Sequence, residues 1–167
     1  MNSLLEEAIE AWEGNRDGVI AEVENIPSEK LDFKPGPDSR TASELALHIM
    51  EVSLMMVGEL TREDTNVHRA EWPKLLAIYN DPIRGLKSKK DIVGALKSTL
   101  QDGVKAFRAA GELHMMQLMT RFDRKRGTRL AWFNHIISHE DYHRGQLAIY
   151  QRLMGIKPAL TKMIEGS

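Results

Sequence analysis

Three histidines near the end of the chain recur at intervals of four residues, at His135, His139 and His143. Two imidazoles four residues apart on an α-helix lie one turn apart on the same face and can chelate a single metal ion. All three cannot readily bind one ion, because the helical rise separates His135 from His143 by about 12 Å. One pair therefore needs a third ligand from another segment.

Helical periodicity indicates which segments must position these histidines. Apolar residues recur at three- and four-residue steps over residues 3–25, 41–60, 88–110 and 128–154. Residues that can cap or stop these helices are Asn2 or Ser3, Thr41 with Glu44, Thr128, Gly111 and Gly155. Residues 62–88 form a long connection with a short helix near 71–78. Residues 112–122 are ambiguous in type, and the tail from about residue 156 is expected to be coil.

Four helices of about 20 residues predict an all-α fold, a four-helix bundle with a long crossover connection between helices 2 and 3. A single domain over residues 1–167 is the expectation at this length. Ligand and metal sites of such bundles are built in the core, from side chains on facing helices. The fold class therefore predicts that the third ligand lies on the inner face of another long helix.

His48 is the best candidate for that third ligand, because it lies on the predicted inner face of the second helix. His68 and His114 fall in or beside connections. The pair that lines up with the apolar face of the last helix is His139 and His143. The sequence thus predicts a three-histidine metal site at His48, His139 and His143. The competing interpretation is that these are hydrogen-bonded core histidines without a metal.

Two other metal motifs fit the sequence less well. Residues 139–143 match the HExxH pattern of zinc peptidases, with Glu140 as the general base. No histidine follows His143, however, and Glu165 in the tail is a poor third ligand. A di-iron carboxylate bundle needs Glu-x-x-His motifs, whereas Glu44 and His48 are four residues apart. Glu140 is therefore expected to be a solvated or hydrogen-bonded helix residue.

Composition excludes several classes of function. The 167 residues contain 23 Lys and Arg against 24 Asp and Glu, so no basic excess attracts nucleic acid. No apolar run reaches the roughly 18 residues that a membrane span needs. The absence of cysteine excludes a thiolate metal site and a cysteine nucleophile. The acidic, amphipathic start lacks signal-peptide features, which favours a cytoplasmic location.

The segment HEDYHRGQL, residues 139–147, resembles the His-x-x-x-His-Arg-Gly-Gln signature of the DinB-like family. Residues 26–51 resemble that family's loop and second helix, so the resemblance spans nearly the whole chain. It implies one divalent ion (nickel, zinc or iron) bound by His48, His139 and His143, and homodimers are common in the family. Within the signature, we expect Gly145 to permit close helix packing and Arg144 to pair with a carboxylate across the bundle.

The resemblance also implies a function, because the family includes transferases and isomerases that use low-molecular-weight thiols such as bacillithiol or mycothiol. We expect a metal-dependent enzyme, of the thiol-dependent S-transferase type, acting on a small-molecule substrate. The alternatives are a metal-dependent hydrolase and a non-catalytic metal- or ligand-binding module. A site closed by Glu44, Glu51 or Glu140 favours the module, and an open site beside a pocket favours an enzyme. Metal affinity is expected to fall below about pH 6.5.

Overall fold

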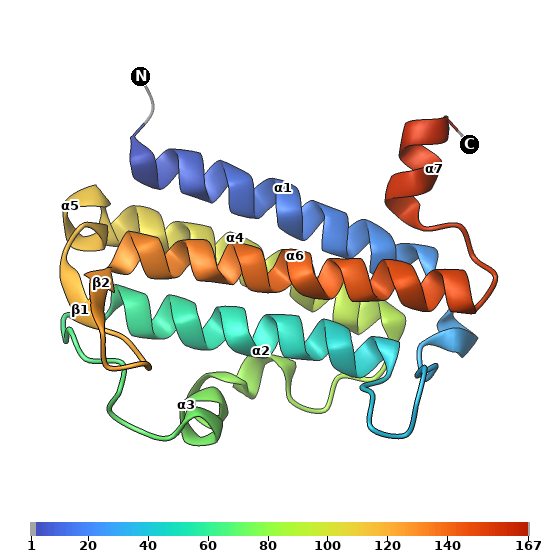
Figure 1. Cartoon of the computed structure of the whole chain (residues 1–167), viewed down its shortest axis with the longest axis horizontal. Coiled ribbons are helices and arrows are strands. Elements are labelled where there is room, and N and C mark those ends of the chain that lie inside the picture. Colours follow the sequence, from blue (N-terminus) through green and yellow to red (C-terminus); the bar gives the residue numbers. More distant parts are fainter. Residues whose placement is uncertain (1–2, 167) are drawn as a thin grey trace.

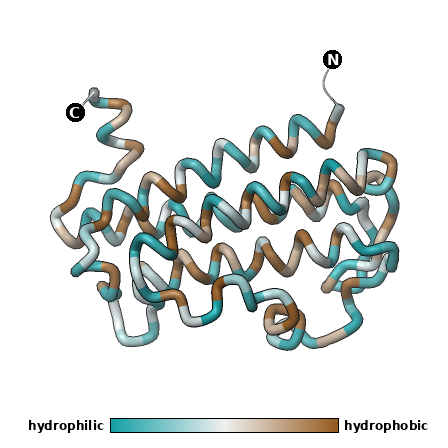
Figure 2. Tube along the Cα trace, turned by 180° about the vertical axis from the view of Figure 1, so that it is seen from behind, coloured by the Kyte–Doolittle hydropathy of each residue, from teal (hydrophilic) through white to brown (hydrophobic). Residues whose placement is uncertain are grey.

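The computed structural model describes residues 3–166, and four long helices packed side by side make up most of it (Figure 1). These helices are α1 (Leu4–Asn25), α2 (Ala42–Thr61), α4 (Lys89–Ala110) and α6 (Arg129–Leu153). The predicted four-helix bundle, with its long crossover between the second and third long helices, is confirmed. Hydrophobic residues recur along each long helix between hydrophilic ones (Figure 2). No helix within the described range is long and apolar enough to cross a membrane.

The helix ends follow the predicted local signals. Ser3 accepts a hydrogen bond from the Glu6 backbone at the start of α1, while Asn2 lies outside the described residues. Thr41 and Glu44 form the predicted capping box of α2. Thr128 caps α6 by accepting from the Ala131 backbone. The two predicted stops, Gly111 and Gly155, have φ of 80° and 75°, in the left-handed region that favours glycine.

The crossover between α2 and α4 contains α3 (Trp72–Tyr79) and a short 3-10 turn, η2 (Asp81–Ile83). Buried Glu59 near the end of α2 fixes this segment. It accepts hydrogen bonds from Arg62 (3.0 Å), from the Tyr79 hydroxyl (2.6 Å) and from Arg69. A second 3-10 turn, η1 (Ser28–Lys30), lies between α1 and α2.

The ambiguous stretch after α4 contains a short helix and a small hairpin. α5 (Glu112–Met115) precedes β1 (Leu118–Thr120), which pairs antiparallel with β2 (Arg126–Thr128). Thr128, the last residue of β2, is also the N-cap of α6.

The prediction of a coil tail was wrong, because residues Ala159–Glu165 form helix α7. Buried Glu22 on α1 accepts hydrogen bonds from the backbone nitrogens of Ala159 (2.8 Å) and Leu160 (3.2 Å). A carboxylate at a helix start satisfies otherwise unpaired donors and interacts favourably with the helix dipole. The local sequence shows no side-chain cap for α7, so periodicity and capping rules missed this helix.

A polar network lies in the middle of the apolar core. Arg16 on α1 is fully buried, and its Nε donates to Glu140 Oε2 on α6 at 2.8 Å. Trp12 Nε1 donates to the other oxygen of the same carboxylate, also at 2.8 Å. The guanidinium also donates to the Leu96 carbonyl and Thr99 Oγ1 on α4 and to Ser53 Oγ on α2. One arginine therefore contacts all three other long helices.

This network decides between the two alternatives expected for Glu140 and positions the last helix. Glu140 is fully buried, so it is hydrogen-bonded but not solvated. Successive residues of an α-helix point about 100° apart. With Glu140 directed at α1, the neighbouring face of α6, which carries His139 and His143, is presented to α2.

Candidate metal centre

Two antiparallel helices supply a cluster of three histidines. His48 lies in the second turn of α2, and His139 and His143 lie one turn apart in the middle of α6. One ring nitrogen from each histidine lies within 4.8 Å of the other two. The ring centroids are 5.1 Å apart for His48 and His139, 5.0 Å for His48 and His143, and 4.4 Å for His139 and His143. The fold thus brings together the three histidines that were predicted from the sequence as metal ligands.

The spacing within the pair on α6 fits a metal ion. The Nε2 atoms of His139 and His143 are 3.1 Å apart. Metal–nitrogen bonds of about 2.0–2.1 Å place neighbouring ligand nitrogens roughly 2.9–3.4 Å apart in octahedral or tetrahedral geometry. Two unprotonated nitrogens at this distance repel each other unless a proton or a cation lies between them. The pair is therefore compatible with a shared divalent ion.

Contacts on the outer side of the rings orient them. His143 Nδ1 donates to Gln146 Oε1 at 2.7 Å, which leaves the Nε2 lone pair of His143 directed at the cluster. Glu51 Oε2 lies 3.5 Å from His48 Nδ1. His139 Nδ1 is buried and has no hydrogen-bond partner among the described residues. A protein hydrogen bond thus orients His143, a carboxylate lies beside His48, and neither holds His139.

The three imidazoles are neutral at pH 7. Burial, followed by the charges of Arg40 and His143, lowers the pKa of His48 to about 4. Burial and the neighbouring histidines lower the pKa of His139 to about 3. Burial also lowers the pKa of His143, partly opposed by its hydrogen bond to Gln146. Neutral imidazole is the form that binds metal, so the cluster is ready for a cation without losing protons.

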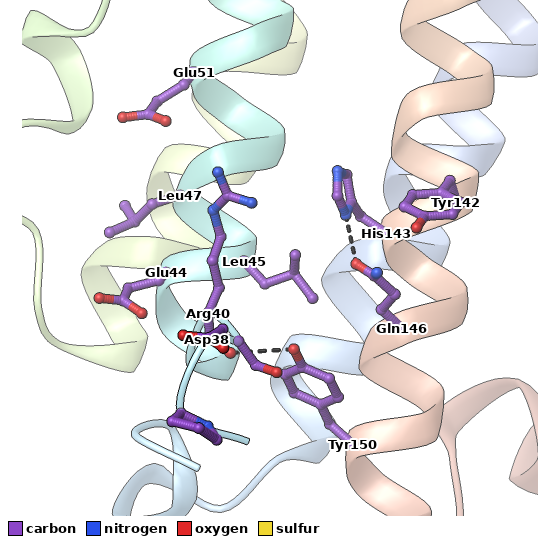
Figure 3. Close-up of a pocket in the computed structure, with 12 residues that line it drawn as sticks. Asp38, Arg40, Glu44, Leu45, Leu47, Glu51, Tyr142, His143, Gln146 and Tyr150 are labelled. Carbon is purple, nitrogen blue, oxygen red and sulfur yellow. Dashed lines mark hydrogen bonds between the residues drawn. The ribbon is translucent and has the colours of Figure 1, made fainter. Parts of the chain in front are cut away.

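A cavity of about 890 Å³ adjoins His143 between α2, α6 and the loop that precedes α2 (Figure 3). The Tyr150 hydroxyl donates to the Arg40 carbonyl at 3.1 Å and ties that loop to α6. The lining residues are Pro37, Asp38, Ser39, Arg40, Glu44, Leu45, Leu47, Glu51, Tyr142, His143, Gln146 and Tyr150. A pocket of this size accommodates a small organic molecule next to the histidines.

None of the three glutamates considered as a closing ligand joins the cluster. Glu44 accepts a hydrogen bond from the Thr41 backbone in the capping box, at 2.8 Å. Glu140 is bound to Arg16, and Glu51 Oε2 lies 3.5 Å from His48 Nδ1. The described residues therefore offer three nitrogen ligands beside a cavity, which is the arrangement of an open site.

The other three histidines lie elsewhere. His135 is exposed and stacks on Trp132, with ring centroids 4.6 Å apart. His114 is hydrogen-bonded to the Leu60 carbonyl at 3.0 Å, and His68 lies 3.2 Å from the Arg124 side chain. These three histidines therefore have structural or surface contacts and take no part in the cluster.

The expectations for Arg144 and Gly145 were wrong. Arg144 forms no ion pair within residues 3–166, and its guanidinium lies against α1, where a Cβ on Gly18 would approach Arg144 Cζ to 2.4 Å. A Cβ on Gly145 would meet nothing within 4 Å. Space for close approach is thus provided by Gly18, which lies across the helix interface from Arg144.

Sequence reasoning assigned no role to three residues that shape the site, Arg16, Arg40 and Gln146. A signal existed for Arg16, because a charged residue one turn after Trp12 interrupts an apolar face. Gln146 lies one turn after His143, a spacing that permits a hydrogen bond between the two side chains. Arg40 carries no sequence signal, because the path of its loop brings it to the cavity.

Comparison with known proteins shows which family and which folds this chain resembles. The family model described as DinB family matches residues 1–165. A DinB-like protein of Bacillus subtilis has a TM-score of 0.65 and 20% identity, over 89% of this chain and 92% of that one. YfiT of Bacillus subtilis, described as a probable metal-dependent hydrolase with an unusual four-helix bundle topology, has a TM-score of 0.71 and 14% identity, over 92% and 89%.

A third similar structure belongs to a thiol-dependent enzyme. The mycothiol-dependent maleylpyruvate isomerase has a TM-score of 0.64 and 12% identity, over 88% of this chain and 63% of that protein. At such identities these structures establish a shared fold. No curated protein sequence matches this chain.

Proposed function

The chain belongs to the DinB family, and from that premise we propose that it is an enzyme that depends on a divalent metal ion held by His48, His139 and His143. The observation that carries this proposal is a set of three ring nitrogens within 4.8 Å of one another beside an open cavity of about 890 Å³. A purely structural site has no need of an adjoining cavity.

We propose that the reaction is of the thiol-dependent S-transferase type. The mycothiol-dependent isomerase of the same fold supports this, and the chain itself contains no cysteine, so the thiol must come from a small cosubstrate. A divalent ion on three neutral imidazoles keeps its full charge and lowers the pKa of a bound water to about 7, or of a thiol from about 8.5. In the transfer, the thiol loses its proton to solvent, its sulfur bonds to an electrophilic carbon, and the bond from that carbon to the leaving group breaks, so that the leaving group departs with the electron pair.

The chain's own residues orient the His143 ring and shape the cavity in which a small molecule would bind. Gln146 holds the His143 ring in the tautomer that presents Nε2. The Tyr150 hydroxyl fixes the loop that forms one wall of the cavity. Leu45 and Leu47 supply apolar surface on the α2 side of that cavity (Figure 3). Together these contacts restrict where a small molecule can lie relative to the histidines.

A metal-dependent hydrolase is the second candidate, and the description of YfiT supports it. The same site would then act on water in place of a thiol, and an ester or amide would be the substrate. The cytoplasmic location and the homodimer expected from the sequence remain predictions.

Metal content tests the proposal directly. Untagged wild-type protein, His48→Ala and His143→Ala are measured by elemental mass spectrometry, with His135→Ala as the matched control one turn from His139. We expect about one divalent ion per chain in the wild type and the control. We expect loss of the ion from the other two variants, with helicity retained by circular dichroism. Absence of stoichiometric metal from the wild type, even after incubation with zinc and nickel, would contradict the proposal.

Activity then separates the two chemistries. The metal-loaded protein is assayed with cellular thiols and a panel of electrophiles, and separately with ester and amide panels. Metal-dependent thiol consumption supports the transferase, and metal-dependent hydrolysis without thiol supports the alternative. Turnover that is unchanged in His143→Ala would show that neither reaction uses this site.

A further inference from the structure

Arg40 is a positively charged residue aimed at the histidine cluster. It lies in the loop directly before α2, and its guanidinium projects into the cavity between α2 and α6, near His143 (Figure 3). The positive charge of Arg40 helps to lower the pKa values of all three histidines of the cluster. Its backbone carbonyl is held by the Tyr150 hydroxyl, so the base of the side chain is fixed.

The guanidinium of Arg40 has no partner in the part of the chain that the structure describes. Among residues 3–166 it forms no hydrogen bond and no ion pair, although Glu44 and Glu51 line the same cavity. Glu44 is engaged by the Thr41 backbone, and Glu51 lies beside His48. An arginine presents up to five donors in a planar fork that matches a carboxylate. Those donors remain available to a molecule in the cavity.

A second donor faces the same space. Gln146 uses its Oε1 atom to accept from His143, and its Nε2 amide has no hydrogen-bond partner among the described residues. Figure 3 shows Gln146 and Arg40 on opposite sides of the cavity, from α6 and from the loop before α2. A ligand group with two acceptor oxygens, placed between them, can accept hydrogen bonds from Arg40 on one side and from Gln146 on the other.

Arg40 would also oppose the metal ion of the proposed function. The Arg40 guanidinium, although exposed, faces the same cavity as the proposed divalent cation, so the two positive charges repel each other. The arrangement becomes favourable when an anion lies between the two positive groups, because the anion attracts both. A neutral ligand leaves the repulsion in place. The positive charges of Arg40 and the metal ion therefore favour a negatively charged molecule in the cavity.

We propose that Arg40 binds a carboxylate of the small molecule that occupies this cavity, with the Gln146 amide as a second donor. The molecule that reacts at the histidine cluster is thus an anion. This inference rests on the proposed function, because it needs the metal ion on the other side of the carboxylate. The carboxylate belongs either to the thiol cosubstrate or to the electrophilic substrate.

The test is the effect of a carboxylate on metal affinity. Zinc dissociation constants are measured by chelator competition, with sodium propionate or sodium chloride at equal ionic strength. For the wild type, propionate is expected to strengthen zinc binding at least about fivefold, the low end of coupling between two bound ligands. Arg40→Gln is expected to bind zinc more tightly than the wild type without propionate, and to lose the response to propionate.

Two further variants complete the comparison. Arg40→Lys keeps the charge and loses the planar fork, so a reduced response is expected. Arg126→Gln removes an exposed arginine on β2, at the opposite end of the bundle from the loop before α2, and is expected to respond as the wild type does (Figure 1). An equal response in the wild type and Arg40→Gln, or no response in the wild type, would overturn the inference.

The outcomes separate this inference from the proposed function. If the wild type binds no metal, both fail. If the wild type binds stoichiometric zinc and its affinity ignores propionate, the proposed function stands and only the role of Arg40 fails. Binding of 3-mercaptopropionate and 2-mercaptoethanol to zinc-loaded protein then identifies the source of the carboxylate. An Arg40-dependent preference for the acidic thiol assigns it to the cosubstrate, and its absence, with the propionate response intact, assigns it to the electrophile.

Discussion

Arg16 and Glu140 form an ion pair between α1 and α6 in which both side chains are completely buried. Removing one partner of a buried pair leaves the other charge without compensation. Glu140→Leu is therefore expected to lower the free energy of unfolding by about 3–5 kcal/mol, measured by urea denaturation. The double variant Arg16→Met with Glu140→Leu is expected to recover part of that loss, because neither charge remains.

The control for this pair is Asp141→Asn on the adjacent, exposed position of α6. Surface substitutions of this kind usually change stability by less than about 0.5 kcal/mol. If Glu140→Leu were no more damaging than the control, the ion pair would have no structural importance.

Gln146 is expected to matter for metal affinity although it lies outside the set of ligands. Its Oε1 atom accepts the Nδ1 proton of His143 at 2.7 Å. Loss of such an outer partner typically weakens metal binding by about 10–100-fold. Gln146→Ala should show this loss by chelator competition, with an unchanged circular dichroism spectrum. Gln101→Ala, on the exposed face of α4, is the control, and equal affinities in the two variants would contradict the assigned role.

The stability of the metal-free protein is expected to depend on pH through the histidine cluster. The pKa is lowered from 6.5 to about 4 for His48 and to about 3 for His139, mainly by burial. The unfolded chain therefore binds protons at a higher pH than the folded one. The free energy of unfolding should be at its full value above pH 6.5 and fall as the pH decreases from 6.5 toward about 4 and 3.

Urea denaturation across this pH range measures the effect. His48→Gln removes one of the titrating groups and should flatten the dependence. The same pKa values move the loss of metal to lower pH than the 6.5 expected from the sequence, since the His48 and His139 imidazoles of the folded protein stay neutral at pH 5. Metal release at pH 6 would contradict this expectation.

Two helical glycines are expected to respond in opposite ways to alanine. A Cβ on Gly103 of α4 would lie 2.5 Å from Cη2 of the fully buried Trp12, so Gly103→Ala forces the core to shift. Such overpacking typically costs about 1–3 kcal/mol. Gly145→Ala meets no atom within 4 Å and should raise stability by about 0.5–1 kcal/mol through helix propensity. Thermal and urea denaturation of both variants test this, and a loss of stability in Gly145→Ala would restore the close-packing interpretation.

The four long helices were predictable because their signals are local. The capping pair Thr41 and Glu44 and the stop at Gly111 act within a few residues of the ends that they define. Helix α7 was missed for the opposite reason. Its start is capped by Glu22, which is close in space and far along the chain. A pattern read within a short window cannot contain that contact.

The same distinction holds for the candidate site. His139 and His143 could be identified by their four-residue spacing, and His48 could be identified by its place on an apolar face. The burial of Glu140 and the position of Arg40 depend on which segments pack together, and the residue types alone are compatible with a solvated surface. The sequence therefore indicated the three possible ligands, while the groups that orient them and face the cavity needed the fold.

The histidine cluster joins the first third of the chain to the last, because His48 and His139 meet only after α2 and α6 have packed together. A bound ion would therefore act as a late, reversible cross-link. It would recognise only the folded chain and stabilise it in proportion to ion concentration. Its main kinetic effect would be to slow unfolding, since contacts formed last lie on the native side of the folding barrier. Metal supply would then govern the lifetime of the folded protein as well as its chemistry.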